Sequence, residues 1–369
     1  MKVELLPVKM NHHETVTNCR MDNGRMSVSL LSYGAAIQGL WPEGFGGRNV
    51  VLSFENPGSY RDNPLYAGAV LGPNAGRLSG AGQLTCNDGA NQLHGGSNGL
   101  SFRNWSVENI QETDDTCSVT FSCRLRDGVD GYPGNRCFTV CYTLCKENCF
   151  AVHLHAVTDR PTYVNMSHHP YFNLSGDFTS SVLGHRLQID ASRYTLLRPD
   201  YIPSGIAECC KTPFDFSVPR TMSEQAEKYP RHPQLEIGRG YNHGFLLNHS
   251  QNKTGMEFPG LVLAEPQSSR QMSVFTDAPC IVVYSGGFIG NDLTLAGKVC
   301  SSASCAAAIE CQDIPDTPSL FPTRMNVITP TAPFHRTIVY RFEGSSNTSS
   351  HSIQQAFQSA QAASHSCRK

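Results

Sequence analysis

Short segments of alternating or β-branched residues, separated by clusters of turn-forming residues, are the feature that most constrains the fold. These segments have the pattern of half-buried strands, whereas long runs with helical periodicity are scarce. With 32 glycines and 22 prolines between them, they predict an all-β protein. We expect one large antiparallel β-sandwich with few short helices, one of them near residues 221–228. The strand segments are 25–31, 118–125, 137–144, 150–158, 280–284 and 337–342.

The segments on either side of the polar turn 146–148 predict a β-hairpin in the middle of a sheet. Their even spacing places Cys137, Cys141 and Cys145 on one face of the first strand. Zinc sites usually pair ligands two to four residues apart across turns, so packing is the better interpretation of this row.

The composition changes at about Gly344, after which Ser, Ala, Gln and His predominate. Such a segment has little apolar surface to bury. We therefore expect a β-sandwich domain over residues 1–343 and a disordered tail over residues 344–369.

Charge, apolar runs and cysteines narrow the class of function. The 29 Lys and Arg residues nearly balance 31 Asp and Glu, and a net charge of −2 favours neither nucleic acid nor an anionic membrane as a partner. No stretch is apolar enough for a signal peptide or a membrane span, and fifteen cysteines without a secretory signal predict reduced thiols. We expect a cytoplasmic protein, monomeric or weakly dimeric, that binds a small neutral ligand.

Two glycine-containing segments carry candidate ligand-binding side chains. The loop 72–80 lacks both the Lys-Ser/Thr of a P-loop and the strand and helix of a dinucleotide loop. Its Arg77 is either a loop ion pair, which is the commoner case, or a donor to an oxygen that becomes negative. His94 precedes Gly95 and Gly96, which would allow a ligand to approach the backbone closely.

Two adjacent histidines and one carboxylate are the candidates for proton transfer. Neighbours in a strand point to opposite faces, so one of His168 and His169 can line a cleft, and the pair does not easily share a metal ion. Histidine suits proton transfer at neutral pH, but a hydrogen-bonded, half-buried ring is an equal alternative. Glu310 emerges from an apolar run, where it is either a general base or the partner of a salt bridge. The residues alone leave these alternatives open.

Taken together and in this order, the segments resemble the aldose 1-epimerase (galactose mutarotase) family. The resemblance extends over about residues 20–343. It implies the galactose mutarotase-like supersandwich fold, and an isomerase that opens and recloses the ring of a free sugar without a metal or other cofactor. Further landmarks of the family are matched at 127–135, 202–205, 212–216, 240–243 and 328–342.

The resemblance also implies roles for particular residues. Glu310, in Ile-Glu-Cys-Gln-Asp-Ile-Pro-Asp, matches the base that takes the proton from the anomeric O1 hydroxyl. His169, in His-His-Pro-Tyr-Phe-Asn-Leu, matches the acid that protonates the ring oxygen. Arg77 and His94 match donors near that oxygen, and Asn242 occupies a position that contacts the sugar.

The chain departs from the family at three polar positions that touch the sugar. Asn242 replaces the aspartate of Gly-Tyr-Asp-His, Gly76 replaces the asparagine that precedes the arginine, and Val282 replaces a glutamine. An amide accepts a hydrogen bond more weakly than a carboxylate does. We therefore expect unchanged ring chemistry with an altered sugar preference, away from free galactose.

Three alternatives remain open on the sequence. A glycoside hydrolase usually needs two carboxylates about 5–9.5 Å apart, and Glu310 is the only strong candidate, although Asp313 and Asp316 follow it. A hexose-6-phosphate 1-epimerase on the same fold should show a basic cluster, and Arg77 has no basic neighbours in its segment. The third alternative is a non-catalytic sugar-binding protein that kept the pocket and lost turnover.

Overall fold

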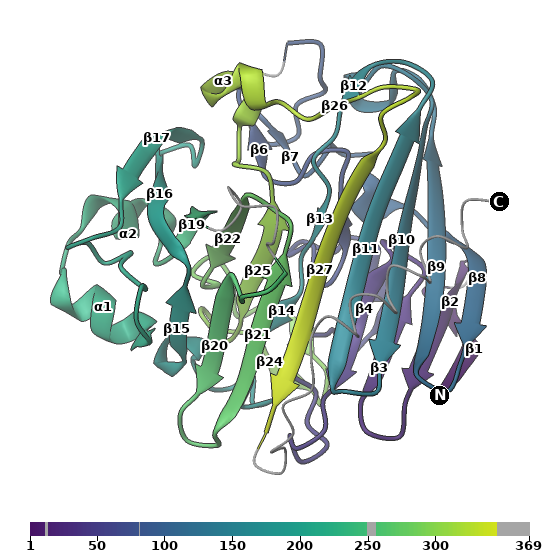
Figure 1. The fold of residues 1–369 in the computed structure, drawn as a ribbon, viewed down its shortest axis with the longest axis horizontal. Helices are drawn as coiled ribbons and strands as arrows, with labels where there is room; N and C mark the ends of the chain where they lie inside the picture. The colour runs from purple at the N-terminus through teal and green to yellow at the C-terminus, as the bar shows by residue number, and fades with distance from the viewer. Residues whose placement is uncertain (12–13, 81, 249–255, 345–369) are drawn as a thin grey trace.

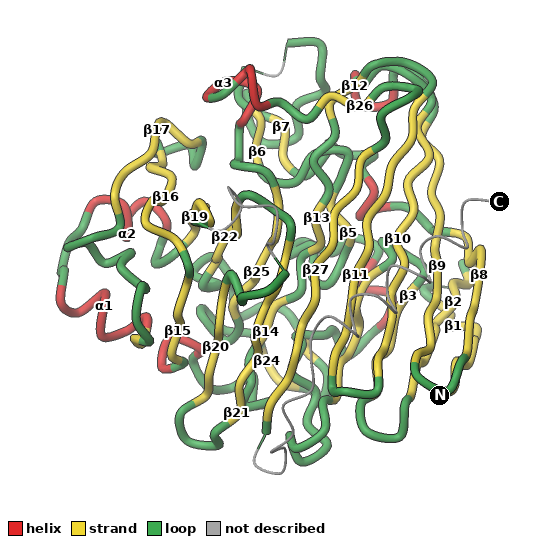
Figure 2. The backbone as a smooth tube through the Cα atoms, in the orientation of Figure 1, coloured by secondary structure: helices red, strands yellow, loops and turns green. Residues whose placement is uncertain are grey.

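The protein is built almost entirely of antiparallel strands, as the sequence predicts (Figures 1 and 2). The computed structural model describes residues 1–11, 14–80, 82–248 and 256–344. The α-helices in this part of the chain are short: α1 (Met222–Lys228), α2 (Pro233–Gly238) and α3 (Thr317–Leu320). None of the described helices is both long enough and apolar enough to span a bilayer.

The predicted helix near 221–228 is confirmed as α1, and a capping box explains where it begins. The Thr221 side chain accepts a hydrogen bond from the Glu224 backbone N–H, and the Glu224 side chain accepts one from the Thr221 N–H.

The largest sheet has nine antiparallel strands, most of them long. Its middle contains the predicted hairpin, in which Cys145 lies opposite Cys149 at the turn. In spatial order the strands are β18 (Arg220–Thr221), β15 (Arg186–Ile189), β20 (Leu261–Glu265), β21 (Arg270–Thr276), β27 (Phe334–Glu343), β11 (Cys149–Thr158), β10 (Arg136–Cys145), β9 (Thr116–Leu125) and β8 (Ser106–Glu112).

Two further sheets pack against the first. The six-stranded sheet has the order β14 (Tyr171–Phe172), β25 (Ala307–Gln312), β22 (Cys280–Tyr284), β19 (Asn242–Leu247), β16 (Ala191–Leu197) and β17 (Pro203–Glu208). The four-stranded sheet runs in chain order through β1 (Lys2–Lys9), β2 (Thr15–Asp22), β3 (Ser27–Leu31) and β4 (Ala36–Trp41).

Short two-stranded pairs complete the described strands. They are β5 (Val70–Leu71) with β13 (Ser167–His168), β6 (Arg77–Leu78) with β7 (Gln92–Leu93), β12 (Thr162–Tyr163) with β26 (Val327–Ile328), and β23 (Thr294–Leu295) with β24 (Val299–Cys300).

One hydrophobic core joins the three larger sheets into the expected sandwich. In Figure 1 the four-stranded sheet lies behind β8 to β11, and the six-stranded sheet lies behind β20 and β21. Leu30, Phe121 and Phe245, one from each sheet, belong to the same buried cluster and are at most 1% exposed. The tail predicted for residues 344–369 lies, apart from Gly344, outside the described residues.

Candidate active site

A pocket of about 310 Å³ opens over one face of the six-stranded sheet. Because side chains alternate along β25, Ile309 and Cys311 enter the core, while Glu310 and Gln312 face the pocket. Pairing with β22 places Val282 directly opposite Glu310. The strand pattern therefore fixes the carboxylate in the floor of the pocket.

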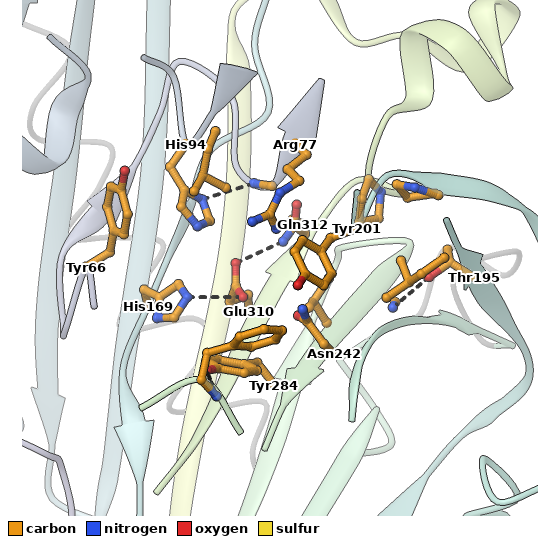
Figure 3. Close-up of a pocket in the computed structure, with 18 of the residues that line it drawn as sticks. Tyr66, Arg77, His94, His169, Thr195, Tyr201, Asn242, Tyr284, Glu310 and Gln312 are labelled. Atoms are coloured by element: carbon orange, nitrogen blue, oxygen red, sulfur yellow. Dashed lines mark hydrogen bonds and ion pairs between the residues drawn. The ribbon is translucent and has the colours of Figure 1, made fainter. Parts of the chain in front are cut away.

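Short connections carry further polar side chains over this floor (Figure 3). The β6–β7 ribbon supplies Arg77 and His94 on one side, and His169 follows β13. The backbone of His169 is fixed because its N–H donates to the Ala69 carbonyl at 2.9 Å and its carbonyl accepts from the Gly68 N–H at 2.8 Å.

All five residues that the resemblance assigns to the site line this one pocket. They come from segments far apart in the chain and are Arg77, His94, His169, Asn242 and Glu310.

Glu310 and His169 are in contact at the bottom of the pocket. Glu310 Oε1 lies 3.3 Å from His169 Nε2, and each residue is 4% exposed. The other carboxylate oxygen, Oε2, accepts a hydrogen bond from Gln312 Nε2 at 3.1 Å. Glu310 thus has an ion-pair partner and also faces the pocket.

Two buried amides that the sequence analysis did not identify hold the carboxylate in place. Asn165 donates to Gln312 Oε1 at 3.4 Å and to the Ala75 carbonyl at 3.2 Å, and it accepts from the Asp313 N–H at 2.9 Å. It thereby ties the end of β25 to the loop that carries Arg77. Gln312 could have been identified from its position two residues after Glu310, because residues two apart in a strand share a face.

His94 is a fixed, neutral hydrogen-bond donor. The Gly76 N–H donates to His94 Nδ1 at 3.1 Å, so the ring proton resides on Nε2. Burial holds the pKa of His94 well below its usual value, and the neighbouring His169 and Arg77 lower it further. The ring therefore offers Nε2–H to a ligand at neutral pH.

The same groups have the composition of a two-histidine, one-carboxylate metal site. The ligand atoms of His94, His169 and Glu310 lie within 4.8 Å of one another. However, a metal needs a lone pair on Nε2 of His94, and the bond from Gly76 leaves a proton there. As arranged, the site suits an oxygen-bearing organic ligand better than a cation.

Arg77 forms an ion pair within its loop and also lines the pocket. Its Nε donates to Asp88 Oδ2 at 2.6 Å, which is the loop ion pair, and its side chain also lines the pocket. Its guanidinium carbon lies 5.1 Å from the centre of the Tyr201 ring. Asp88 and Tyr201 therefore hold a cation in the lining of the pocket that contains Glu310 and His169.

The three positions at which the chain departs from the family also line the pocket: Gly76, Asn242 and Val282. Within the described part of the chain, the Asn242 side-chain amide has no hydrogen-bond partner, so its donor and acceptor are available to a ligand. Val282 contributes an apolar surface beside Glu310.

The chain neighbours of the two pocket histidines pack against the protein itself. Gly95 and Gly96 lie in a turn close to the protein's own chain: a Cβ on Gly95 would lie 2.2 Å from the Gly72 carbonyl oxygen. His168 points away from the pocket, as expected of a neighbour of His169, and its Nε2 lies 2.9 Å from the Tyr340 hydroxyl. Burial lowers the pKa of His168 to about 3.

The two other candidate carboxylates have structural partners. Asp313 accepts from Arg336 Nη2 at 2.7 Å, and Asp316 accepts from the backbone N–H of Ser79 at 3.0 Å and from its hydroxyl at 2.6 Å. Neither lines the pocket. Of the described residues that do, Glu310 is the only carboxylate and Arg77 the only Lys or Arg.

Comparison with known proteins identifies relatives that all belong to one family. A family model described as aldose 1-epimerase matches residues 18–330. The aldose 1-epimerase of Escherichia coli K12 is 31% identical over 309 residues, covering 81% of this chain and 86% of the relative. Galactose mutarotase of Sus scrofa is 30% identical over 295 residues, covering 77% and 81% respectively. The crystal structure of galactose 1-epimerase from Lactobacillus acidophilus NCFM superimposes with a TM-score of 0.80 at 25% identity, over 93% of this chain and 99% of that one.

Proposed function

The chain belongs to the aldose 1-epimerase family, and we propose that Glu310 and His169 are the base and the acid of its reaction. It is an isomerase that interconverts the α and β anomers of a free aldose. The observation that carries the assignment is the 3.3 Å contact between the two side chains inside the buried pocket. O1 and O5 of a pyranose are bonded to the same carbon, so an acid and a base that act on them must line the same small pocket, as these two side chains do.

The proposed reaction moves two protons and breaks one bond. Glu310, as a carboxylate, takes the proton from O1, and the O1–C1 bond becomes a carbonyl as the C1–O5 bond breaks. His169, as an imidazolium, gives its Nε2 proton to O5. After rotation about C1–C2, the same transfers run in reverse on the other face of the aldehyde. Each residue then regains its starting protonation state, so the cycle needs no cofactor.

His94 and Arg77 serve as donors in this proposal. Negative charge develops on the ring oxygen as its bond to C1 lengthens, and fixed N–H groups stabilise that charge in a buried site. His94 presents Nε2–H because Gly76 occupies Nδ1. Arg77 is held in place by its ion pair with Asp88.

The residues that line the pocket favour this reaction over hydrolysis of a glycoside and over epimerisation of a hexose 6-phosphate. A hydrolase of the usual type needs a second carboxylate in the site, and the described lining residues supply only Glu310. A sugar phosphate would need further cations, and Arg77 is the only one among the same residues, already paired with Asp88.

We further propose that the sugar preference differs from that of relatives named for galactose. Asn242, Gly76 and Val282 line the pocket. By the resemblance, Gly76 and Val282 replace polar side chains there, and Asn242 replaces a carboxylate. An amide in place of a carboxylate weakens acceptance of a hydrogen bond from a sugar hydroxyl. Free galactose should therefore be a weaker substrate than glucose or xylose.

Polarimetry on freshly dissolved α-glucose, α-galactose, xylose and maltose tests the assignment directly. The wild-type protein should speed equilibration of at least one sugar, and Glu310→Gln should reduce that rate by about 10²–10⁴-fold. If the wild type were no faster than the variant on every sugar, the assignment would be wrong. If galactose proved the best substrate, only the altered preference would be wrong.

We also propose a cellular location, an oligomeric state and an area of metabolism for this enzyme. A cytoplasmic, monomeric or weakly dimeric enzyme of hexose metabolism is consistent with described cysteines that form no disulfide. Subcellular fractionation and sedimentation of the purified protein would test these points.

A further inference from the structure

The outer face of the nine-stranded sheet carries histidines that play no part in the proposed reaction. Strand alternation sends Leu154 and Ala156 of β11 into the core, so His155 between them faces outward. On β27 the same alternation turns His335 outward, next to the core residue Phe334. His155 is half-buried and His335 is exposed, so both imidazoles are accessible from solvent.

The register of the sheet brings these two rings together. β11 and β27 are antiparallel neighbours at the front of Figure 1, and His155 lies directly opposite His335. Their ring centroids are 4.6 Å apart, with an angle of 47° between the ring planes. Because both side chains stand on paired strands rather than on a loop, the backbone ladder of the sheet fixes their spacing.

This spacing suits two imidazoles that share one metal ion. Two imidazoles on the same tetrahedral zinc ion, with Zn–N distances of about 2.0–2.1 Å, have ring centres about 5 Å apart. The angle of 47° lies midway between the stacked and the edge-to-face arrangements that aromatic pairs prefer. Packing of one ring on the other therefore does not by itself explain the arrangement.

We propose that His155 and His335 form a two-histidine site for a divalent transition-metal ion on the outer face of the nine-stranded sheet. Water molecules complete the coordination shell. Imidazole nitrogen suits Cu²⁺, Ni²⁺ and Zn²⁺, whereas Mg²⁺ and Ca²⁺ take oxygen ligands. Affinity should follow the usual order for nitrogen ligands, with Cu²⁺ bound more tightly than Ni²⁺ or Zn²⁺ and with no binding of Mg²⁺.

The neighbouring side chains leave coordination to the two imidazoles. Asp277 interacts electrostatically with His335, but its Oδ1 already lies 3.5 Å from Arg336 Nε. His153 also faces outward on β11, but it is buried and its Nδ1 lies 3.2 Å from the Thr337 hydroxyl. With two protein ligands, the site should bind zinc more weakly than a structural site with four.

The pocket is the competing location for a metal ion. His94, His169 and Glu310 have ligand atoms within 4.8 Å of one another, on the opposite side of the core from the outer face. An ion bound there would occupy the groups that transfer protons and would stop the proposed reaction. An ion at His155 and His335 would leave that reaction unchanged, so the two locations can be told apart.

Isothermal titration calorimetry of the full-length protein without a purification tag tests the site, with CuCl₂, NiCl₂, ZnCl₂ and MgCl₂ as the probes. His155→Gln and His335→Gln each remove one proposed ligand, and His169→Gln alters the pocket. His232→Gln is the matched control, because His232 is a half-buried histidine at the start of α2 and lies outside the pocket.

We expect the wild type to bind one Cu²⁺, Ni²⁺ or Zn²⁺ per chain at the outer face. Loss of an outer-shell partner of a metal ligand costs about 10–100-fold in affinity, so loss of either histidine should cost at least as much. His232→Gln and His169→Gln should bind as the wild type does. His335→Cys, which keeps a zinc ligand, should retain zinc binding.

Two further measurements separate loss of the site from loss of the fold. Without metal, His335→Gln should keep the wild-type melting temperature and mutarotation rate. Saturating Zn²⁺ should raise the melting temperature of the wild type but not that of His335→Gln, because an ion that binds the folded state stabilises it.

Three outcomes overturn the proposed metal site: a wild type that binds none of the three transition-metal ions, a His335→Gln variant that binds them as tightly as the wild type, or a His169→Gln variant that alone loses binding. The last would place the ion in the pocket. None of these outcomes bears on the assignment of Glu310 and His169, which polarimetry tests separately.

Discussion

At the scale of single residues, the surroundings of each carboxylate decide its role. Glu310 is buried but faces a pocket, whereas Asp313 is buried against Arg336 away from it. Asp115 pairs with Lys146 at 2.6 Å in solvent, with 74% of its side chain exposed. Removal of these three carboxylates should therefore have different effects on activity and on the free energy of unfolding.

Neutralising Asp313 should destabilise the fold far more than neutralising Asp115. Asp313→Asn leaves the buried Arg336 charge without its close partner, and breaking such a pair costs about 3–5 kcal/mol. The matched variant Asp115→Asn breaks an exposed pair, worth at most about 1 kcal/mol. Urea unfolding of both variants gives the two free energies of unfolding, and equal values would contradict this view of Asp313.

The sequence predicted the residues of the site better than their internal arrangement. Arg77, His94, His169 and Glu310 could be identified because their residue types and motif order resemble one family. The tautomer of His94 could not, because it depends on the Gly76 N–H, which the pairing of β6 with β7 brings beside the ring. What Gly95 and Gly96 approach could not be predicted either, because a positive φ serves equally to approach a ligand or the protein's own chain.

At the scale of elements, long strands and one helix were predictable from local pattern. The hairpin of β10 and β11 follows from two alternating segments around a polar turn, and the capping box of α1 is encoded in its own residues. The predicted bounds were off by two residues at the starts of β3 and β9 and by three at the start of β27. Strand ends depend on neighbours that the local pattern does not contain.

The elements that carry the site were the hardest to predict. Several strands near the pocket have only two residues each, which is too few for an alternating pattern. They are β5, β6, β7, β13 and β14. They form because the large sheets hold their flanking segments together. The site was therefore found through residue chemistry and motif order rather than through the elements that position it.

At the scale of the whole molecule, the fold buries several histidines away from the reaction. Burial lowers the pKa of His153 and His185 to about 4, and that of His168 and His243 to about 3. In the unfolded chain each would titrate near a pKa of about 6.5. The folded protein thus keeps neutral rings where the unfolded chain would become charged.

These lowered pKa values predict loss of stability in acid. Below pH of about 6.5 the unfolded chain binds protons that the folded protein does not, so the free energy of unfolding falls as the pH drops. Each histidine contributes about 1.4 kcal/mol per pH unit until its folded pKa of about 3 to 4 is reached. Burial raises the pKa of Asp277, so this carboxyl binds its proton more readily in the folded protein and offsets part of the loss of stability. It is one group against four histidines. The melting temperature should be flat above pH 7 and fall steadily from pH 6 to 4.5. A constant melting temperature over this range would contradict the lowered pKa values of the buried histidines.

The most direct measurement of the central claim is the catalytic rate of Glu310→Gln, of His169→Gln and of the double variant on the best sugar found by polarimetry. If the two residues act as one base–acid unit, each single change should lower kcat by about 10²–10⁴-fold with little change in melting temperature. The double variant should be hardly slower than the worse single one. A folded single variant that kept more than about a tenth of the wild-type kcat would contradict the claim, because each proton transfer should contribute far more than that.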